Sequence, residues 1–274
     1  MKISVIMGIY NCEPYLDEAV QCILNQTYTD WELIMCDDGS SDQTYDIARK
    51  YEMQYPNKIK VLKNVSNQGL NYTLNRCLKA ARGQYIARMD GDDLCSSDRF
   101  EKEVAILDSR SDISIVSAYL EYFDENGVWG ICRYKEYPQK KDFLRGPQFC
   151  HAACMVRKEA FDQVEGYTVD KKLLRVEDYH LWVKMYAAGY RGYNIQEPLY
   201  QMRDDQNAYH RRKFKYRINE MYVKILLIKK FKLPIHSYVL ALKPVMIGLL
   251  PMAAYKHFHK ARLKNAEEHF QGKK

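Results

Sequence analysis

The chain has 274 residues, of which 47% are hydrophobic and 28% charged, and its formal net charge is +7. These proportions are ordinary for a globular protein and argue against a disordered or fibrous chain. The length is sufficient to bury a substantial core, as one large domain or as a domain with an appendage.

The charge is distributed unevenly along the chain. Residues 211–274 contain 16 Lys or Arg against three Asp or Glu, which gives +13. Residues 1–210 contain 26 against 32, which gives −6. This division predicts an acidic body over 1–210 and a basic tail over 211–274 that meets an anionic surface.

The eight cysteines form no CxxC pair and no cluster with zinc-like spacing. Met1 and Lys2 lead directly into an apolar stretch without the features of a signal peptide. We therefore expect free thiols in a cytosolic compartment. Cys150 stands beside His151, but no third orienting group lies nearby in sequence, so packing thiols are expected rather than a nucleophile.

Strands and helices are predicted to alternate along the first 95 residues. We expect strands at 3–7, 31–36, 60–63 and 84–88, and helices at 14–25, 41–55 and 69–81. Ser41 can cap the second helix, and Asp42 suits an Asx cap on the same helix. This alternation predicts an α/β fold with a mostly parallel sheet and right-handed crossovers.

The pattern is more mixed from residue 96 to residue 210. We expect helices at 97–109 and from 157, strands at 113–123 and 128–137 joined by an Asn-Gly hairpin turn, and an extended stretch at 149–156. An amphipathic helix is predicted from Val176 to Gly189, with Leu181, Met185 and Ala188 facing inward. This half is expected to share the sheet.

Three carboxylates follow the fourth predicted strand, at Asp90, Asp92 and Asp93. Carboxylates packed together at the end of a buried strand repel one another and lose hydration, and a divalent cation relieves both costs. A solvated turn that caps the helix near Ser97 is the alternative, but three carboxylates exceed what capping needs. Asp38 ends the second strand, and ligands of such sheets bind beyond the carboxyl ends, so both clusters are predicted on one rim.

Several short motifs occur in a specific order along residues 1–210. They are Ser4-Val5-Ile6-Met7-Gly8-Ile9-Tyr10-Asn11, Asp37-Asp38-Gly39-Ser40-Ser41-Asp42, Asn67-Gln68-Gly69, the run from Arg82 to Asp93, and Glu177-Asp178. In this order they resemble the inverting glycosyltransferases of family 2, of the GT-A fold type, especially bacterial enzymes of surface-polysaccharide assembly. The resemblance implies a nucleotide-sugar half over 1–95 and an acceptor half over 96–210.

The resemblance implies that Asp38 holds the nucleotide base by accepting from an N–H of uracil, which suits a group that only accepts hydrogen bonds. Asp92 would contact Mn²⁺ or Mg²⁺ directly, with Asp90 nearer the ribose or a metal-bound water, and Asp93 could do part of either job. The other implied donor-binding residues are Ile9, Tyr10, Asn11, Asn67 and Gly91, with Tyr10 able to stack on the base. Leu74 replaces an arginine found in many relatives, which removes the basis for a basic nucleotide contact there.

On the acceptor side, the resemblance implies that Asp178 is the general base, which takes the proton of the attacking hydroxyl. An Asp near its reference pKa of about 3.9 would be ionised at neutral pH with little tuning. First-turn acids also complement a helix dipole, and Glu177 is the expected structural partner. Possible acceptor or diphosphate contacts are His151, Glu177 and Arg203. A structural histidine, and a surface ion pair of Arg203 with Asp204 or Asp205, are the alternatives.

The tail combines a basic amphipathic segment at 211–232 with an apolar stretch at 244–255. Those 12 residues are too few for a membrane-spanning helix, which needs about 20. We expect a helical extension that lies on an anionic membrane; packing on the body or in a dimer ranks second, and nucleic acid last.

The predicted protein is a metal-dependent inverting glycosyltransferase, cytosolic and peripheral on the inner face of the cell membrane. It would move a sugar from a nucleotide, with UDP favoured, to a lipid-linked oligosaccharide. A nucleotidyltransferase is one alternative, but the loop at 8–13 lacks its Gly-rich basic phosphate motif. A non-catalytic, membrane-bound scaffold that binds nucleotide sugars is another, and it would leave Asp178 unused. The sequence does not reveal the sugar, the linkage or the oligomeric state.

Overall fold

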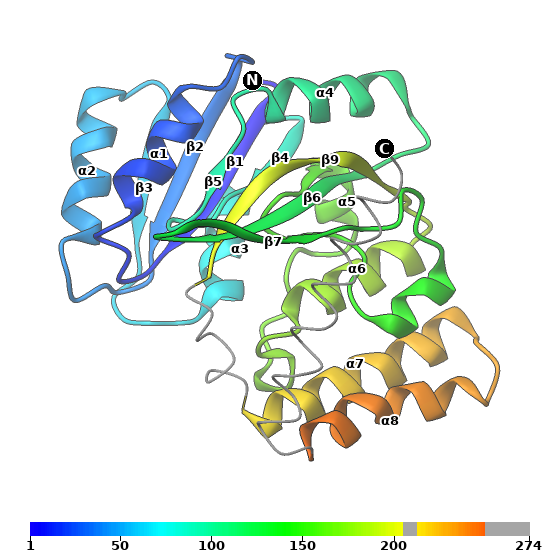
Figure 1. Cartoon of the computed structure of the whole chain (residues 1–274). Helices are drawn as coiled ribbons and strands as arrows, with labels where there is room; N and C mark the ends of the chain where they lie inside the picture. Colours follow the sequence, from blue (N-terminus) through cyan, green and yellow to red (C-terminus); the bar gives the residue numbers. More distant parts are fainter. Residues whose placement is uncertain (205–212, 250–274) are drawn as a thin grey trace.

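A single mixed sheet forms the centre of the computed structural model, which describes residues 1–204 and 213–249 (Figure 1). Its strands lie in the order β3-β2-β1-β4-β8-β6-β9-β5, and β7 pairs with β6. The strands are β1 (Ile3–Ile9), β2 (Trp31–Asp37), β3 (Ile59–Lys63), β4 (Tyr85–Arg88), β5 (Leu94–Cys95), β6 (Ile115–Asp124), β7 (Gly127–Cys132), β8 (Met155–Arg157) and β9 (Gly192–Arg203).

The first four strands are parallel, as the alternating pattern predicts: β1 pairs in parallel with both β2 and β4, and β2 with β3. The short strand β8 runs antiparallel between β4 and β6, which restores a common direction, and β9 continues in parallel with β6. The prediction of a mostly parallel α/β sheet is therefore confirmed.

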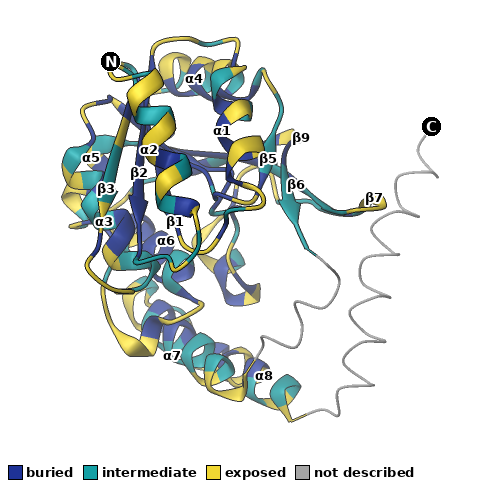
Figure 2. Cartoon of the chain, turned by 90° about the vertical axis from the view of Figure 1, so that its left-hand side faces the viewer, coloured by how far each residue is buried: buried dark blue, intermediate teal, exposed yellow. Residues whose placement is uncertain are grey.

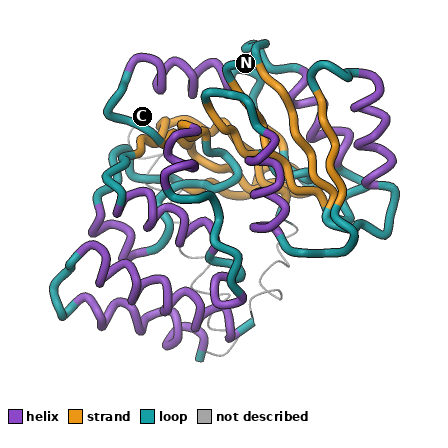
Figure 3. The backbone as a smooth tube through the Cα atoms, turned by 180° about the vertical axis from the view of Figure 1, so that it is seen from behind, coloured by secondary structure: helices purple, strands orange, loops and turns teal. Residues whose placement is uncertain are grey.

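Helices cover both faces of the sheet (Figures 1 and 3). They are α1 (Leu16–Leu24), α2 (Thr44–Gln54), α3 (Leu70–Ala80), α4 (Arg99–Ser109), α5 (Lys158–Gln163), α6 (Glu177–Ala187), α7 (Phe214–Phe231) and α8 (Ser237–Gly248), with 3₁₀ turns at Lys140–Arg145 and Lys171–Leu173. One core contains apolar residues of α1, α2 and α4, and the second contains those of α3, α5, α6, α7 and α8. Successive side chains of a strand point to opposite faces, so Val5 and Met7 enter the first core and Ile6 the second.

The structure departs from the predicted elements in several places. The long strand β9 was not predicted, and Pro198 within it argues against a strand on sequence alone. The pairing shifts register beside that proline, which accommodates it. Of the expected extended stretch 149–156, only the last two residues belong to a strand, β8. Ala188 is exposed rather than inward-facing.

Of the two candidates for the cap of the second helix, Asp42 makes the contact. It accepts from the backbone N–H of Thr44, the first residue of α2. The hydroxyl of Ser41 instead donates to Asn11.

The two C-terminal helices form a pair beyond α6 (Figures 1 and 2). Val223, Leu227 and Ile228 of α7 are buried, as is Ala241 of α8, so this part of the basic tail packs on the body. Within the described residues, no helix is both long enough and apolar enough to cross a membrane. The expected boundary at 210/211 and the end of the tail from residue 250 lie outside the described residues.

Candidate active site

The sheet brings the two predicted acidic clusters to one rim. Strand β1 lies between β2 and β4, so the loop after β1 is flanked by Asp38, which follows β2, and by the aspartates that follow β4. Gly91 packs closely against that loop, because a Cβ at this position would lie 3.0 Å from Ile9 Cγ2 and from Cys12 Sγ. The predicted shared rim is therefore confirmed, and glycine allows this close approach without displacing the neighbouring side chains.

The loop after β1 is fixed to the loop after β2 through Asn11. Its backbone N–H donates to Ser40 Oγ at 3.0 Å, and its side-chain Oδ1 accepts from the N–H of Ser41 at 2.9 Å. Asn11 has a left-handed φ of 48°, which asparagine tolerates better than most residues. Tyr10 is 50% exposed beside this anchor, so its ring is available to a ligand.

Asp38 is buried, and its carboxylate accepts three hydrogen bonds from the chain. The donors are Asn64 Nδ2 at 2.6 Å, the N–H of Gln68 at 2.8 Å and the N–H of Gly69 at 2.9 Å. A carboxylate offers about four acceptor positions, so room for one further donor remains on Oδ2. Asp38 thus shapes the 66–69 loop and keeps capacity for one N–H of a ligand.

A basic side chain reaches this loop from Arg76 rather than from position 74. Leu74 is fully buried in the second core, whereas Arg76 donates to Asn64 Oδ1 and to the carbonyl of Lys63, both at 2.6 Å. Because Asn64 in turn donates to Asp38, Arg76 supports the same carboxylate indirectly. Asn67 itself is exposed at the tip of the loop.

The three aspartates after β4 have different environments. Asp90 forms an ion pair with the buried Arg88, and its backbone N–H donates to the hydroxyl of Tyr200 at 3.1 Å. Asp93 is buried and accepts from Tyr200 Oη at 2.9 Å and from the N–H of Arg203 at 2.8 Å. Asp93 therefore ties the turn to β9.

Asp92 is the exposed member, and no side chain or backbone group of another described residue donates a hydrogen bond to its carboxylate. Crowding by surrounding protein and the charge of Asp90 raise its pKa above the ordinary value. Burial and the charges of Asp90 and Asp92 raise the pKa of Asp93 further. The turn thus concentrates negative charge that a cation would relieve.

The residues of this turn fit a hard divalent cation that is shared with a ligand. Among residues 1–204 and 213–249, no three His, Cys, Asp or Glu side chains form a complete metal site. Asp92 offers free carboxylate oxygens, and Asp90 lies beside it. One or two carboxylates, with the remaining positions filled by phosphate oxygens and water, are the usual protein share of a Mg²⁺ site.

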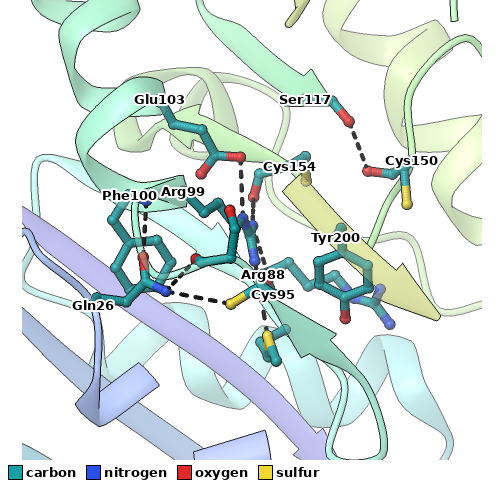
Figure 4. A network of polar contacts seen from close by, with 12 residues as sticks. Gln26, Arg88, Cys95, Arg99, Phe100, Glu103, Ser117, Cys150, Cys154 and Tyr200 are labelled. Atoms are coloured by element: carbon teal, nitrogen blue, oxygen red, sulfur yellow. Dashed lines mark hydrogen bonds and ion pairs between the residues drawn. The ribbon is translucent and has the colours of Figure 1, made fainter. Parts of the chain in front are cut away.

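The buried guanidinium of Arg99 holds the chain on either side of the aspartate turn (Figure 4). Arg99 is fully buried, pairs with Glu103 at 3.2 Å, and donates to the carbonyls of Arg88 at 3.0 Å and Cys154 at 3.4 Å. Its guanidinium also lies 5.2 Å from the ring centroid of Tyr200. The end of β4, β8 and the tyrosine that holds Asp93 are therefore locked together.

Asp178 lies in the first turn of α6, and its environment differs from the expected one. Burial, reinforced by the charge of Glu177, raises the pKa of Asp178 to about 6, so the expectation of an untuned carboxyl is wrong. The positive charge of Arg88 acts on Asp178 in the opposite direction. Asp178 and Asp90 both raise the pKa of Tyr167, which indicates that the three groups share one region.

His151 belongs to the same region. Its Nε2 lies 2.7 Å from the hydroxyl of Tyr167, and its ring packs edge-on against Trp182. Burial and the charge of Arg88 lower the pKa of His151 well below the ordinary value, so the imidazole is neutral at pH 7.

Arg203 has an ion-pair partner that neither alternative named. Its guanidinium donates to Glu18 at 2.6 Å and to the carbonyl of Asp92 at 3.0 Å. It also lies over the rings of Tyr15 and Phe123, at 4.3 and 4.6 Å from their centroids. Arg203 thus connects α1 to the aspartate turn and keeps a face on the cavity.

The aspartate turn forms one wall of a cavity of about 460 Å³. The opposite walls come from the β6–β7 hairpin, the loop before α6, the end of β9 and the start of α7. Its lining residues are Asp90, Asp92, Asp93, Tyr122, Trp129, Arg175, Val176, Met202, Arg203, Asp204, Lys213, Tyr216, Arg217 and Glu220. Asp178 is not in this lining, but Val176, two residues before it, is.

A parallel sheet with a DxD-type turn at its carboxyl rim and a second carboxylate beyond it defines a glycosyltransferase of the GT-A class. The mannosyltransferase PcManGT from Pyrobaculum calidifontis, solved with GDP-Man and Mn²⁺, has this fold: the TM-score is 0.68 at 21% identity, over 95% of this chain and 79% of that one. The chain belongs to glycosyl transferase family 2, whose model matches residues 4–165.

Curated relatives agree with this assignment. The chain is 41% identical to the putative glycosyltransferase EpsE of Bacillus subtilis, over 97% of this chain and 96% of that protein. It is 28% identical to the Escherichia coli UDP-Glc:alpha-D-GlcNAc-diphosphoundecaprenol beta-1,3-glucosyltransferase WfgD, over 67% of this chain and 69% of that protein. The predicted family, GT-A fold and glycosyltransferase activity are therefore confirmed.

The sequence reasoning missed several residues of this region. Arg88 was noted only as part of a strand, although it pairs with Asp90 and its charge acts on His151 and Asp178. A buried arginine just before an acidic turn was the available signal. Tyr200 and Arg175 gave none, because only the fold brings Tyr200 to the aspartate turn and Arg175 to the cavity.

Proposed function

We propose that this protein is a metal-dependent, inverting glycosyltransferase that uses a UDP-sugar and extends a lipid-linked precursor of a surface polysaccharide. The observation that carries the proposal is the cavity, which has Asp92 and Asp90 on one wall and Val176, two residues before Asp178 of α6, in its lining. The name of WfgD supports the donor and acceptor classes, and the Mn²⁺ complex of PcManGT supports the metal.

The donor would lie along the carboxyl rim. In this proposal the base stacks on Tyr10 and donates an N–H to the remaining acceptor position of Asp38. The loop residues Ile9, Asn11 and Asn67 would border the nucleotide, and Gly91 would bring the backbone of the aspartate turn close to the loop after β1 on which the nucleotide lies. Asp92 and Asp90 would hold Mn²⁺ or Mg²⁺, which neutralises negative charge on the leaving diphosphate.

Asp178 would act as the base on the acceptor side. It takes the proton of the acceptor hydroxyl while the hydroxyl oxygen attacks the anomeric carbon. The bond from that carbon to the diphosphate oxygen breaks, its electron pair leaves with the nucleoside diphosphate, and the configuration inverts. A raised pKa makes Asp178 a better proton acceptor than an ordinary carboxylate. Glu177, whose Oε2 is buried without a partner among the described residues, is a candidate contact for the acceptor.

The outer face of α8 supports a membrane-bound acceptor. Five exposed apolar residues in and beside α8 recur three or four positions apart, which places them on one stripe: Ile235, Val239, Leu242, Met246 and Leu249. Tyr238 and Leu240 are exposed outside this spacing. Lys229, Lys230, Lys232 and Lys243 are exposed around the stripe, and residues 221–249 contain no Asp or Glu. Apolar side chains bordered by lysines suit the anionic inner face of a membrane. We propose that the protein is cytoplasmic and rests there by this stripe.

The Asp178→Asn variant tests the assignment of the base. We expect transfer to fall at least about 100-fold, because a positioned base contributes about 10²–10⁴. UDP binding in Mn²⁺ should stay within about twofold of wild type. Asp162→Asn, a surface carboxylate on α5, is the matched control and should turn over normally. Unchanged transfer by Asp178→Asn would remove this residue as the base.

A further inference from the structure

We propose that the cavity wall facing the aspartate turn is an acceptor subsite for a glycosyl diphosphate, in which the sugar stacks on Trp129 and the phosphates meet Arg175, Lys213 and Arg217. This inference rests on the proposed function and specifies the part of the acceptor that the chain recognises. It assigns a role to cavity residues that the donor site leaves unused.

The sugar platform is built by the β6–β7 hairpin. The rings of Tyr122 and Trp129 are stacked, with centroids 5.2 Å apart and planes 21° from parallel. The indole Nε1 donates to the carbonyl of Asp204 at 3.0 Å, which fixes the ring. Both rings line the cavity and are only partly buried. The negative face of a fixed aromatic ring attracts the polarised C–H groups of a sugar ring.

Cations from two separate segments surround the platform. Arg175 comes from the loop before α6, and Lys213 and Arg217 come from the start of α7; all three line the cavity. Arg175 has a left-handed φ of 68° and makes no hydrogen bond or ion pair with any other described residue. Glu220 also lines the cavity and pairs with Arg217 at 3.3 Å. Guanidinium groups are well suited to phosphate oxygens.

The cationic end of the cavity is next to the apolar stripe of α8. A Cβ at Gly248 would lie 3.0 Å from Arg217 Cγ and 2.9 Å from the ring of Phe214, so the end of α8 rests on the first turn of α7. Met246 and Leu249 flank this contact and are exposed. A lipid chain leaving a diphosphate at Arg217 would therefore meet the stripe directly. This continuity favours a lipid-linked glycosyl diphosphate.

Val176 links the cavity that contains Trp129 to the segment that carries the proposed base, Asp178. It lines the same cavity, and Asp178 follows it by two residues in the first turn of α6. In this proposal a sugar on Trp129 shares one cavity with the aspartate turn, which would hold the donor, and with Val176, which precedes the proposed base.

Intrinsic fluorescence provides a direct readout of this subsite. Of the three tryptophans of the chain, Trp31 and Trp182 are buried, whereas Trp129 is partly exposed. We would titrate the full chain with glucosyl, galactosyl and N-acetylglucosaminyl diphosphates that carry a short alkyl chain. At least one should cause a saturable change in emission that Trp129→Phe abolishes. No saturable change with any of the three would overturn the proposal.

Three further probes test whether the subsite needs both the sugar and the phosphates, and whether its cations bind the donor diphosphate instead of the acceptor diphosphate. The methyl glycoside lacks the phosphates, and the alkyl diphosphate lacks the sugar; each should bind at least about tenfold more weakly than the intact probe, since each keeps only half of the contacts. UDP with Mn²⁺ should not displace the probe. Displacement by UDP would mean that the cations hold the donor diphosphate instead, and would overturn the assignment.

Steady-state kinetics supply the second test. Trp129→Ala and Arg175→Ala should each raise the acceptor KM about tenfold, with donor KM and slow donor hydrolysis unchanged. Trp129→Phe, which keeps an aromatic face, should stay within about threefold of wild type. Val128→Ala is the matched control, because the neighbouring residue of β7 points to the other face of the hairpin.

The outcomes distinguish this inference from the proposed function. If wild type neither binds nor hydrolyses a nucleotide sugar, the proposed function fails. If it does both while Trp129→Ala and Arg175→Ala leave the acceptor KM unchanged, only the acceptor subsite is refuted.

Discussion

The two sides of the cavity are built in contrasting ways. The aspartate wall follows the strand β4, and its buried carboxylate Asp93 is held by two hydrogen bonds. Asp38, outside the cavity on the same rim of the sheet, is buried and held by three. The opposite wall combines a hairpin, a loop and the start of α7, and its cations are exposed or half-buried. The sheet thus fixes the wall at which we propose that the donor binds. Segments added to the sheet form the wall at which we propose that the acceptor binds.

We expect Asp92→Asn to have the largest effect on activity of the substitutions in the aspartate wall. Removing the one exposed carboxylate takes away the proposed direct metal contact, so we expect kcat to fall by about 10²–10³ as leaving-group stabilisation is lost. The metal dependence of the residual rate should shift to higher Mn²⁺. Asp112→Asn, a surface carboxylate that pairs with Arg110, is the control. An unaltered Mn²⁺ titration for Asp92→Asn would contradict its ligand role.

The pH dependence of transfer should reveal the tuned base. Because only ionised Asp178 can take a proton, kcat/KM for the acceptor should fall as pH drops through about 6, rather than through about 4. A profile that stays flat down to pH 5 would exclude this assignment.

The same carboxylate should affect stability. Its folded-state pKa is raised above the unfolded value, so the native state binds the proton more tightly and loses stability as pH rises from about 4 through 6. Asp178→Asn should therefore raise Tm at pH 7, and the difference should shrink at pH 4. An equal Tm difference at both pH values would contradict the raised pKa.

The α8 stripe should give the smallest effect on chemistry and a clear effect on location. Val239→Glu with Leu242→Glu places charge on the exposed face, so binding to vesicles containing anionic lipid should fall at least about tenfold while transfer to a short-chain acceptor stays unchanged. Glu substitutions at exposed Met53 and Val65, on the far side of the body, form the control. Unchanged vesicle binding would reject the stripe as the membrane contact.

The aspartate wall was largely predictable from sequence because its residues stand at the ends of consecutive strands. Strand order alone places Asp38 and Asp90 on one rim, and the family motifs supply their implied roles. The sequence did not indicate that Asp93 connects the aspartate turn to β9. Its partners Tyr200 and Arg203 are more than 100 residues away, on a strand that was not predicted because it contains a proline.

The acceptor wall was much less predictable. Trp129 and Arg175 line one cavity only because the fold brings the loop before α6 near the β6–β7 hairpin of the sheet, and no spacing in the sequence encodes that proximity. The raised pKa of Asp178 has the same origin, since it depends on burial by folded neighbours. The basic composition of the tail predicted an anionic partner, but not that α7 would contribute its side chains to the cavity.

The binding of UDP with and without Mn²⁺ tests the central claim most directly. Calorimetric titration of the wild-type chain should give saturable binding in Mn²⁺ that weakens at least about tenfold with EDTA, because the diphosphate would otherwise face Asp90 and Asp92 without a cation between them. Equal affinity in Mn²⁺ and in EDTA, or no binding in either, would contradict a metal-bridged donor site at this rim.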